Sequence, residues 1–471
     1  MREFDLVVLG GGPAGVTGAR WSALLGGRVA LVEREHDIGG AGFNTGTVPS
    51  KALRETALAL CGLQTRRLLG VDVSLRTETS MHELTAARER VSQSARQRAI
   101  ASLQEARVER ISGVGSFVDP QTIRVTAPGA PDQLLRAAHV LIATGSAPFR
   151  PPVFPFEDDR VHDSTELLQI QTLPARLAIV GAGVIGSEYA CTFAALGVDV
   201  HVIDGRPSLM PFLDGEIAAA LVAAMAGAGV TFHWSEEVRR CTVSGPEVVL
   251  ELSSGATLPC GNVLVCAGRS SNTADLNLAA AGLVPGRRGV IEVDAHFRTA
   301  VPHIYAAGDV IGAPALASTG MEQARVAACH MVGATAKADS SPLLATGVYT
   351  IPEVGMVGET EESLRASGVE YIAGRVRYDR TPRGRLIGDE TGLMKLLFRR
   401  EDDRLLGVHI IGELATELVH VGQAAMLSSA GADLFNRACF NYPTLGDLYK
   451  LATYDMLLQR VEEARGVSIA P

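Results

Sequence analysis

The sequence predicts an α/β protein with two βαβ units and a separate C-terminal α+β domain. At 471 residues, the chain is longer than one hydrophobic core usually organises. One order of elements, an apolar strand, a glycine-rich turn, a helix and a second apolar strand, occurs at residues 4–33 and again at 177–204. After about residue 340, strand-like segments are followed by two helical patterns. These observations predict three structural regions.

The first unit places its glycine-rich turn between a strand and a helix. Residues 10–15 fit the pattern GxGxxG, and an acid ends the second strand. In such Rossmann-like units the glycines let a pyrophosphate approach the backbone, the helix N-terminus donates N–H groups to it, and the acid binds ribose hydroxyls. The predicted binding positions are Gly10, Gly12, Pro13, Ala14, Gly15 and Glu33.

The second unit repeats this arrangement at residues 181–186, again with an acid at the end of the second strand. Two units in one chain imply two dinucleotides, most economically one tightly held flavin and one exchanging nicotinamide. The predicted positions of the second site are Gly181, Gly183, Val184, Ile185, Gly186 and Asp204.

The remaining elements follow in chain order. Residues 80–110 have helical apolar spacing, residues 112–142 carry short strand-like runs, and the proline-rich stretch 147–152 is typical of a linker. The C-terminal region shows strand-like segments and then helical patterns, at 346–358, 371–378, 393–399, 405–411, 413–430 and 444–465.

Composition argues against several classes of protein. The net charge of -9 and the pI near 5.7 disfavour a nucleic-acid partner or an anionic membrane surface. No apolar run is long enough for a membrane span, and no export signal opens the chain. The 7 cysteines are scattered without a CxxC pair, so neither a disulfide framework nor a metal site is expected, and a cytoplasmic location is predicted.

Four segments carry a resemblance to a known family. Four segments of the flavoprotein disulfide reductases are resembled in order: the active-site segment by residues 39–51, the end of the first FAD segment by 143–145, the end of the nicotinamide domain by 268–269, and the second FAD motif by 299–309. This family includes lipoamide dehydrogenase, glutathione reductase and mercuric reductase. The resemblance implies FAD, NAD(H) or NADP(H), and a homodimer in which a C-terminal segment reaches the partner's flavin. It adds further expected cofactor-binding positions: Arg34, Gly40, Thr45, Lys51, Gly115, Thr144, Gly145, Asp309 and Ala317, with Gly268 for the nicotinamide.

The same resemblance implies a domain order. Residues 1–148 are expected to form the first part of an FAD-binding domain, and residues 149–270 an NAD(P)-binding domain. Residues 271–343 would return to the FAD-binding, central domain, and residues 344–471 would form an interface domain for dimerisation.

The chain departs from the disulfide-using members of this family in two places. Gly42 and Thr47 stand where those members have two cysteines, and neither side chain forms a thiolate or a disulfide. In the segment expected to reach the partner's flavin, Tyr442 replaces a histidine and Asp447 replaces a glutamate. Tyrosine, with an ordinary pKa of about 10, is a poor proton shuttle at neutral pH. Disulfide substrates are therefore not expected.

The nicotinamide and flavin half of the family's mechanism remains. The resemblance implies an ion pair between Lys51 and Glu188 beside the reactive flavin nitrogen, and these two are the expected catalytic residues. Asp204 favours an unmodified ribose and therefore NAD, whereas Arg206 is either a contact for the 2′-phosphate of NADP or a solvated loop charge.

The soluble FAD-dependent NAD(P)⁺ transhydrogenases are similar to the chain at residues 46–51, 415–423 and 441–444. Their reaction is hydride exchange between NADPH and NAD⁺ through the flavin. The alternatives are an NAD(P)H:quinone reductase or diaphorase, an NADH oxidase, and a non-catalytic flavin-binding regulatory protein.

Overall fold

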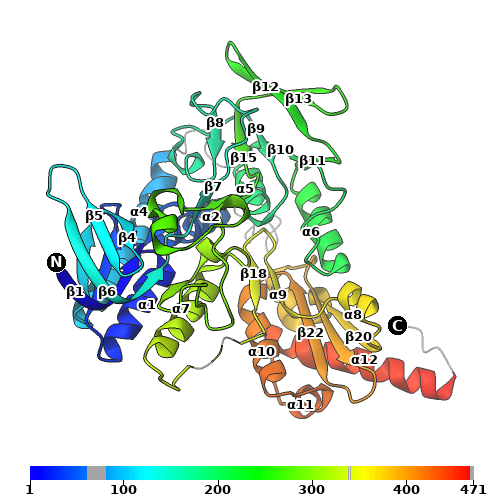
Figure 1. The fold of residues 1–471 in the computed structure, drawn as a ribbon. Coiled ribbons are helices and arrows are strands. Elements are labelled where there is room, and N and C mark those ends of the chain that lie inside the picture. Colours follow the sequence, from blue (N-terminus) through cyan, green and yellow to red (C-terminus); the bar gives the residue numbers. More distant parts are fainter. Residues whose placement is uncertain (61–80, 338, 340, 467–471) are drawn as a thin grey trace.

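The computed structural model describes residues 1–60, 81–337, 339 and 341–466, and Figure 1 shows their arrangement. Cys61, residue 80 of the expected helix 80–110, and residues 467–471 of the expected interface domain lie outside the described residues. None of the described helices is long and apolar enough to cross a membrane.

The first sheet is centred on β1 (Arg2–Leu9), which pairs in parallel with β2 and β6. β17 also pairs in parallel with β6, although it follows the whole second sheet in the chain. The chain therefore leaves the first sheet and returns to it. The other strands are β2 (Val29–Glu33), β3 (Glu109–Ser112), β4 (Val114–Asp119), β5 (Thr122–Thr126), β6 (Gln133–Ile142) and β17 (Ile304–Ala306).

The register of this sheet brings three strand ends together. Leu9 and Ala306 both pair with Ile142, so β1, β6 and β17 end at the same edge. Parallel sheets bind their ligands at this carboxyl edge. The register therefore places a candidate site where these three strands end.

Helices cover the first sheet. α1 packs against α7, and Gly18 lets α1 lie close to β6 because a Cβ there would lie 2.4 Å from Leu141 Cδ2. The helical segment expected from residue 80 is α4, which ends earlier than expected because β3 follows it. The helices of this region are α1 (Pro13–Leu24), α2 (Thr47–Leu60), α4 (Met81–Glu105) and α7 (Ala317–Met331), with a π-helical turn, η1 (Ala41–Thr45), before α2.

The second sheet is entirely parallel, with the strand order β11-β10-β9-β15-β8. A three-stranded antiparallel sheet, β12-β13-β14, projects from it at the top of Figure 1. The strands are β8 (Val161–Asp163), β9 (Arg176–Val180), β10 (Asp199–Asp204), β11 (Val230–Trp234), β12 (Val238–Ser244), β13 (Glu247–Leu252), β14 (Thr257–Cys260) and β15 (Asn262–Val265), and the helices are α5 (Val184–Ala195) and α6 (Gly215–Gly227).

A short ribbon joins the first and second regions. β7 (Ser146–Pro148) pairs antiparallel with β16 (Arg269–Ser271), so the outgoing and returning chains lie side by side. The proline-rich stretch 147–152, expected as a linker, thus begins inside a hydrogen-bonded strand pair.

The C-terminal region is an antiparallel sheet with the order β18-β19-β22-β21-β20. The expected segment 346–358 is two strands, and the other expected strands and both helices are present. The elements are β18 (Thr346–Val348), β19 (Val354–Gly358), α8 (Glu361–Ser367), β20 (Tyr371–Arg377), α9 (Pro382–Ile387), β21 (Leu393–Arg399), β22 (Leu405–Ile411), α10 (Ala415–Leu427), α11 (Ala432–Arg437) and α12 (Leu448–Arg465).

A buried lysine joins the second region to the C-terminal sheet. Lys395 Nζ, on β21, lies 2.8 Å from Asp214 Oδ1 and 2.6 Å from Glu361 Oε1. Asp214 caps α6, and its side chain is 0% exposed. Burial is the largest influence and acts to raise the pKa of Asp214, but the hydrogen bond and charge of Lys395, together with His409 and the backbone of Glu361, hold this pKa below its ordinary value. The two regions are therefore held together by charges that depend on each other.

Replacing Lys395 by methionine should lower the free energy of unfolding by about 3–5 kcal/mol, because Asp214 would be left with a buried, unpaired charge. Since the folded-state pKa of Asp214 is lowered, the stabilisation is present at neutral pH and is lost as the pH falls through that pKa. Urea unfolding should therefore give a higher free energy of unfolding for the wild type than for the Lys395→Met variant at neutral pH. This difference should become smaller at acid pH.

Lys337→Met is the matched control, because Lys337 pairs with Glu322 at a partly exposed surface. Its loss should cost about 0–1 kcal/mol. Equal losses in the two variants would contradict the account of a buried junction.

Candidate dinucleotide sites

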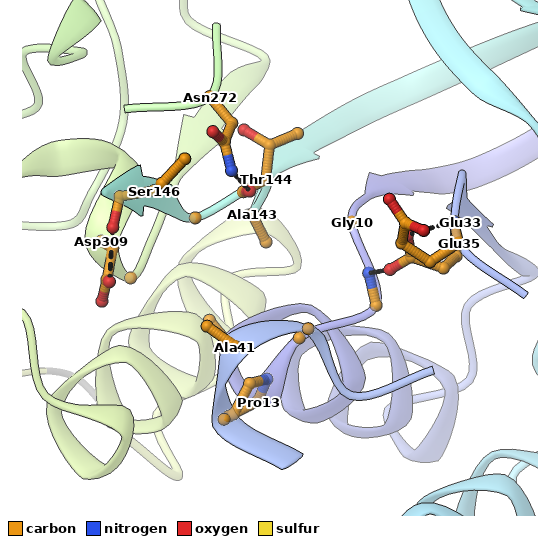
Figure 2. Close-up of a pocket in the computed structure, with 18 of the residues that line it drawn as sticks. Gly10, Pro13, Glu33, Glu35, Ala41, Ala143, Thr144, Ser146, Asn272 and Asp309 are labelled. Carbon is orange, nitrogen blue, oxygen red and sulfur yellow. Dashed lines mark hydrogen bonds between the residues drawn. The ribbon is translucent and has the colours of Figure 1, made fainter. Parts of the chain in front are cut away.

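A cavity of about 600 Å³ lies at the carboxyl edge of the first sheet. Gly10, Ala143 and Ala307 line it, each directly after β1, β6 or β17 (Figure 2). These three backbones are tied together, because Ala143 N donates to Leu9 O at 2.8 Å and Ala307 N donates to Ile142 O at 3.0 Å. The cavity wall is therefore an extension of the sheet.

Most positions expected at the first site line this cavity. They are Gly10, Gly12, Pro13, Ala14, Glu33, Arg34, Gly40, Thr45, Gly115, Thr144, Gly145, Asp309 and Ala317. Gly15 and Lys51 are not among the lining residues. Segments far apart in the sequence thus meet around one space.

The first glycine-rich turn has room for a side chain at only one of its key positions. Gly10 has a φ of +103°, and a Cβ there would lie 2.5 Å from Ala143 O. A Cβ on Gly15 would lie 1.8 Å from Gly10 O. A Cβ on Gly12 would meet nothing within 4 Å. Gly10 and Gly15 are therefore needed for packing, and Gly12 faces open space.

The second turn has the same geometry. Gly181 has a φ of +107°, and a Cβ there would lie 2.5 Å from Cys266 O. A Cβ on Gly186 would lie 2.0 Å from Gly181 O, and one on Gly183 would meet nothing within 4 Å. Val184 and Ile185 begin α5 directly after this turn. Two copies of one phosphate-type turn are therefore present.

The acid at the end of each second strand holds its turn. Glu33 accepts hydrogen bonds from Gly11 N at 2.6 Å and from Glu35 N at 2.9 Å. Asp204 accepts one from Ala182 N at 2.6 Å. Each acid thus fixes the middle of its own turn and stands where ribose hydroxyls are bound in this kind of unit.

Asp204 also pairs with Arg206. The guanidinium donates from Nε at 2.9 Å and from Nη2 at 2.7 Å, and the backbone N of Arg206 donates at 2.8 Å. Burial is the largest influence and acts to raise the pKa of Asp204, but the hydrogen bonds from Arg206 and Ala182 and the charge of Arg206 together lower this pKa. The Arg206 side chain is 45% exposed, so it is not a freely solvated charge but is still accessible.

The cavity wall has a polar group without a partner. Thr144 Oγ1 is buried and makes no hydrogen bond among the described residues, whereas Thr144 O accepts one from Asn272 Nδ2 at 3.0 Å (Figure 2). A buried hydroxyl without a partner is costly and calls for a ligand. Together with the open space at Gly12, it fits a cofactor that carries a pyrophosphate and hydroxyl groups.

The ion pair expected between Lys51 and Glu188 is present. Lys51 Nζ lies 2.5 Å from Glu188 Oε2, and Glu188 Oε1 accepts a hydrogen bond from Tyr349 N at 3.0 Å. The Lys51 ammonium also lies 4.9 Å from the centre of the Tyr349 ring. The pair joins α2 to α5, the helix that follows the second turn, and the backbone next to β18 orients it.

Gly42 and Thr47 stand at the two positions where the sequence resemblance leads one to look for cysteines. Gly42 is buried, and a Cβ there would lie 2.4 Å from Pro13 Cγ, so the proline ring occupies the space of a side chain. Thr47 lines the cavity. No cysteine is among the described residues that line it. Beside the second turn, burial raises the pKa of Cys266 to about 12, so it stays a thiol at neutral pH.

Several cavity residues were not predicted from the sequence. Ser146, Asn272 and Arg269 line the cavity and lie in or next to the ribbon of β7 and β16. Ser146 follows the expected Gly145, and Arg269 follows Gly268, so adjacency was the available signal. Gly268 itself does not line the cavity; a Cβ there would lie 2.5 Å from Arg288 Nη1.

The C-terminal segment is exposed in the single chain. Tyr442 is 77% exposed, and Asp447 stands at the start of α12. Exposed apolar side chains lie on α10, α11 and α12, namely Val421, Leu427, Leu434, Tyr454, Leu458 and Val461.

Gly12→Ala and Gly183→Ala should separate the two sites. Both glycines have extended backbone, with φ of −72° and −80°, so alanine fits without strain. The free energy of unfolding of the cofactor-free proteins should change by less than about 0.5 kcal/mol. Each methyl would occupy the path of a pyrophosphate, which should weaken binding at its own site about tenfold or more.

Flavin fluorescence and nicotinamide titration check this prediction. Gly12→Ala should lose flavin, and Gly183→Ala should keep flavin and bind nicotinamide dinucleotide weakly. Flavin loss in Gly183→Ala alone would reverse the assignment of the two turns.

Comparisons with known proteins cover nearly the whole chain. Residues 4–327 match the family model of the pyridine nucleotide-disulphide oxidoreductases, and residues 344–453 match the dimerisation domain of that family. A protein named soluble pyridine nucleotide transhydrogenase from Mycobacterium tuberculosis is 43% identical over 458 residues, which are 97% of this chain and 98% of that protein. One of the same name from Colwellia psychrerythraea is 37% identical over 458 residues, with the same coverage of 97% and 98%.

Solved structures agree with the fold. LpdA from Mycobacterium tuberculosis superimposes with a TM-score of 0.88 at 27% identity, covering 96% of this chain and 99% of that one. The HOCl-induced flavoprotein disulfide reductase RclA from Escherichia coli gives 0.85 at 25% identity, covering 95% and 99%. The chain therefore belongs to the pyridine nucleotide-disulphide oxidoreductase family, and it is an FAD-dependent oxidoreductase that uses nicotinamide dinucleotides.

Proposed function

We propose that this enzyme is a pyridine nucleotide transhydrogenase, which moves a hydride between NADPH and NAD⁺ by way of FAD. The proposal is carried by two observations: no cysteine is among the described residues that line the cavity, and both dinucleotide turns are intact. The relatives that match over almost the full chain have the same activity in their names.

The missing thiols determine where electrons can go. In the disulfide-using relatives a dithiol takes electrons from the flavin, but here Gly42 and Thr47 offer no sulfur. The ring of Pro13 fills the space beside Gly42, so the position cannot regain a cysteine without a shift of backbone or ring. A second nicotinamide is then the natural acceptor at the same flavin face.

The residues of the first site would hold FAD as follows. The N–H groups at Gly12 and the start of α1 would bind the pyrophosphate, Glu33 the ribose, and Asp309 the hydroxyl-bearing chain of the flavin. Bound FAD would supply the hydride carrier between the two nicotinamides. The protein's own task is to stack and orient the reacting rings and to exclude competing acceptors.

Lys51 and Glu188 would act on both sites at once. The ammonium is held by a carboxylate on the helix that follows the second turn, so its position depends on both regions. We assign to the Lys51 ammonium, held in place by Glu188, a fixed positive potential beside the flavin ring that assists the arrival of a hydride. Its geometry needs no proton transfer, in keeping with a reaction that requires none.

Asp204 and Arg206 would select the nucleotide. Asp204 suits the free ribose of NAD(H), and the guanidinium of Arg206 is a suitable partner for the 2′-phosphate of NADP(H). Because the two are hydrogen-bonded to each other, Arg206 offsets the charge with which Asp204 would repel that phosphate. One site can therefore serve both nucleotides.

We further propose a homodimer with the domain order given by the family. Residues 1–148 and 271–343 would form the FAD-binding domain, residues 149–270 the NAD(P)-binding domain, and residues 344–471 the interface domain. Exposed Tyr442, followed by Asp447, would reach the partner's flavin site. A cytoplasmic location fits the six described cysteines, all of which are free.

Anaerobic double-mixing stopped-flow tests the reaction. NADPH should bleach the flavin of the purified protein, and NAD⁺ added next should restore the oxidised spectrum at the steady-state turnover rate. Reoxidation by a quinone but not by NAD⁺ would sink the proposal and favour a quinone reductase. Lys51→Met should slow the bleaching about tenfold or more, and Lys337→Met, at a residue that is not among those lining the cavity, should leave it unchanged.

Arg206→Ala tests nucleotide choice. Loss of a charge-assisted contact should lower kcat/KM for NADPH about 10- to 100-fold, and kcat/KM for NADH should stay close to the wild-type value. Steady-state kinetics with both donors measure the change. A parallel loss for NADH and NADPH would show that Arg206 only maintains the turn.

A further inference from the structure

Arg269 stands where the chain returns from the second region to the first. It begins β16, and its backbone pairs with Pro148 in β7. Its side chain lines the cavity beside Ser146 and Asp309, and all three come from segments that the ribbon and β17 bring together. This placement gives Arg269 contacts with both sides of the ribbon.

The three side chains form a short chain of hydrogen bonds. Arg269 Nε lies 2.7 Å from Ser146 Oγ, and Arg269 Nη2 lies 2.6 Å from Ser146 O. Ser146 Oγ lies 2.7 Å from Asp309 Oδ2 (Figure 2). Arg269 Nε is 3.7 Å from that same carboxylate oxygen. Arg269 therefore makes two hydrogen bonds to Ser146, and its connection to Asp309 is mainly indirect, through the Ser146 hydroxyl.

The chemistry of these groups determines which group donates and which accepts in each of these hydrogen bonds. Arginine has only donors and an ionised carboxylate has only acceptors. Ser146 Oγ must accept from Arg269, so its single hydrogen is committed to Asp309. Ser146 then has no hydrogen left for a ligand, whereas Asp309 keeps lone pairs that face no protein donor among the bonds described. Asp309 becomes the acceptor for ligand hydroxyls on this wall.

The guanidinium also sets the charge of this wall. Its Nε lies 3.7 Å from Asp309 Oδ2, so the formal charges of the two groups oppose each other, and both side chains are only about a quarter exposed, at 23% and 27%. A wall with acceptors but little net charge suits an uncharged polyol chain better than a phosphate or a free cation.

We infer that Arg269 is a positioning residue for the hydroxyl-bearing chain of FAD. It commits the Ser146 hydroxyl to Asp309 and so presents Asp309 to the ligand as a fixed acceptor. This inference rests on FAD occupying the cavity, and not on which nicotinamide or other acceptor reoxidises it. Because Arg269 belongs to the ribbon, FAD bound at Asp309 also fixes the crossing between the two regions.

The release of FAD from the purified holoenzyme tests the inference. After dilution, the rise of free-flavin fluorescence gives the rate of release for wild type, Arg269→Gln, Ser146→Ala and the double variant. Arg269→Gln should release FAD about 10- to 100-fold faster, the effect of losing charge-assisted hydrogen bonds. The double variant should release it no faster than the more affected single variant, because both changes break one chain.

Two further variants guard against a general structural effect. Arg269→Lys keeps the charge, but one ammonium cannot replace both arms of the guanidinium, so its release rate should fall between those of wild type and Arg269→Gln. Arg287→Gln removes an exposed arginine outside the cavity lining and should release FAD at the wild-type rate.

Wild-type release from Arg269→Gln would overturn the inference. If the increases in release rate caused by the two single substitutions multiply in the double variant, the proposed series of hydrogen bonds from Arg269 through Ser146 to Asp309 would be overturned. If Arg269→Gln does not fold, a wild-type rate of FAD release from Arg269→Lys would overturn the role of the two hydrogen bonds from Arg269 to Ser146. A wild-type protein that carries no FAD would instead defeat the proposed function, and failure of NAD⁺ to reoxidise the flavin would leave these release rates unaffected.

Discussion

The site depends on one close approach of backbones: the first glycine of each turn lies against the end of a neighbouring parallel strand. Gly10 meets the carbonyl of Ala143, and Gly181 meets that of Cys266, at separations that no Cβ could share. Parallel register sets this approach, because it ends neighbouring strands at one edge. The turn then presents its amides and the helix N-terminus to the same space. Every other part of the two sites is arranged around these contacts.

The second constraint is the absence of sulfur where the fold normally carries it. The scaffold superimposes on that of the flavoprotein disulfide reductase RclA with a TM-score of 0.85 and on that of LpdA with a TM-score of 0.88. Yet Gly42 packs under the Pro13 ring and Thr47 faces the cavity. The same fold therefore supports a shorter electron path, since function lies in the site and not in the scaffold. The Lys51–Glu188 pair is present, and the proposed reaction, like that of the disulfide-using relatives, passes a hydride at the flavin.

Polar junctions, and not apolar packing alone, hold the regions in their relative places. Lys395 binds three carboxylates between the second region and the C-terminal region, and Lys51 and Glu188 meet across the first and second regions. Arg269 does the same within the ribbon. Charge-assisted hydrogen bonds are directional, so they fix orientation where hydrophobic contacts would allow sliding. Hydride transfer needs this, because the two rings must meet in a narrow range of geometry.

The sequence by itself determined the local features: both glycine turns with Glu33 and Asp204, the strands and long helices of the C-terminal region, and the loss of the cysteine pair. These are readable because strand, turn and helix patterns depend on residues close together in the chain. Only the tertiary structure decided that Asp204 is paired with Arg206, that Pro13 fills the space at Gly42, and that Arg269 grips Ser146. Residues 146 and 269 are far apart in sequence, and hydrogen-bond direction and free space exist only once the sheets have brought such residues together.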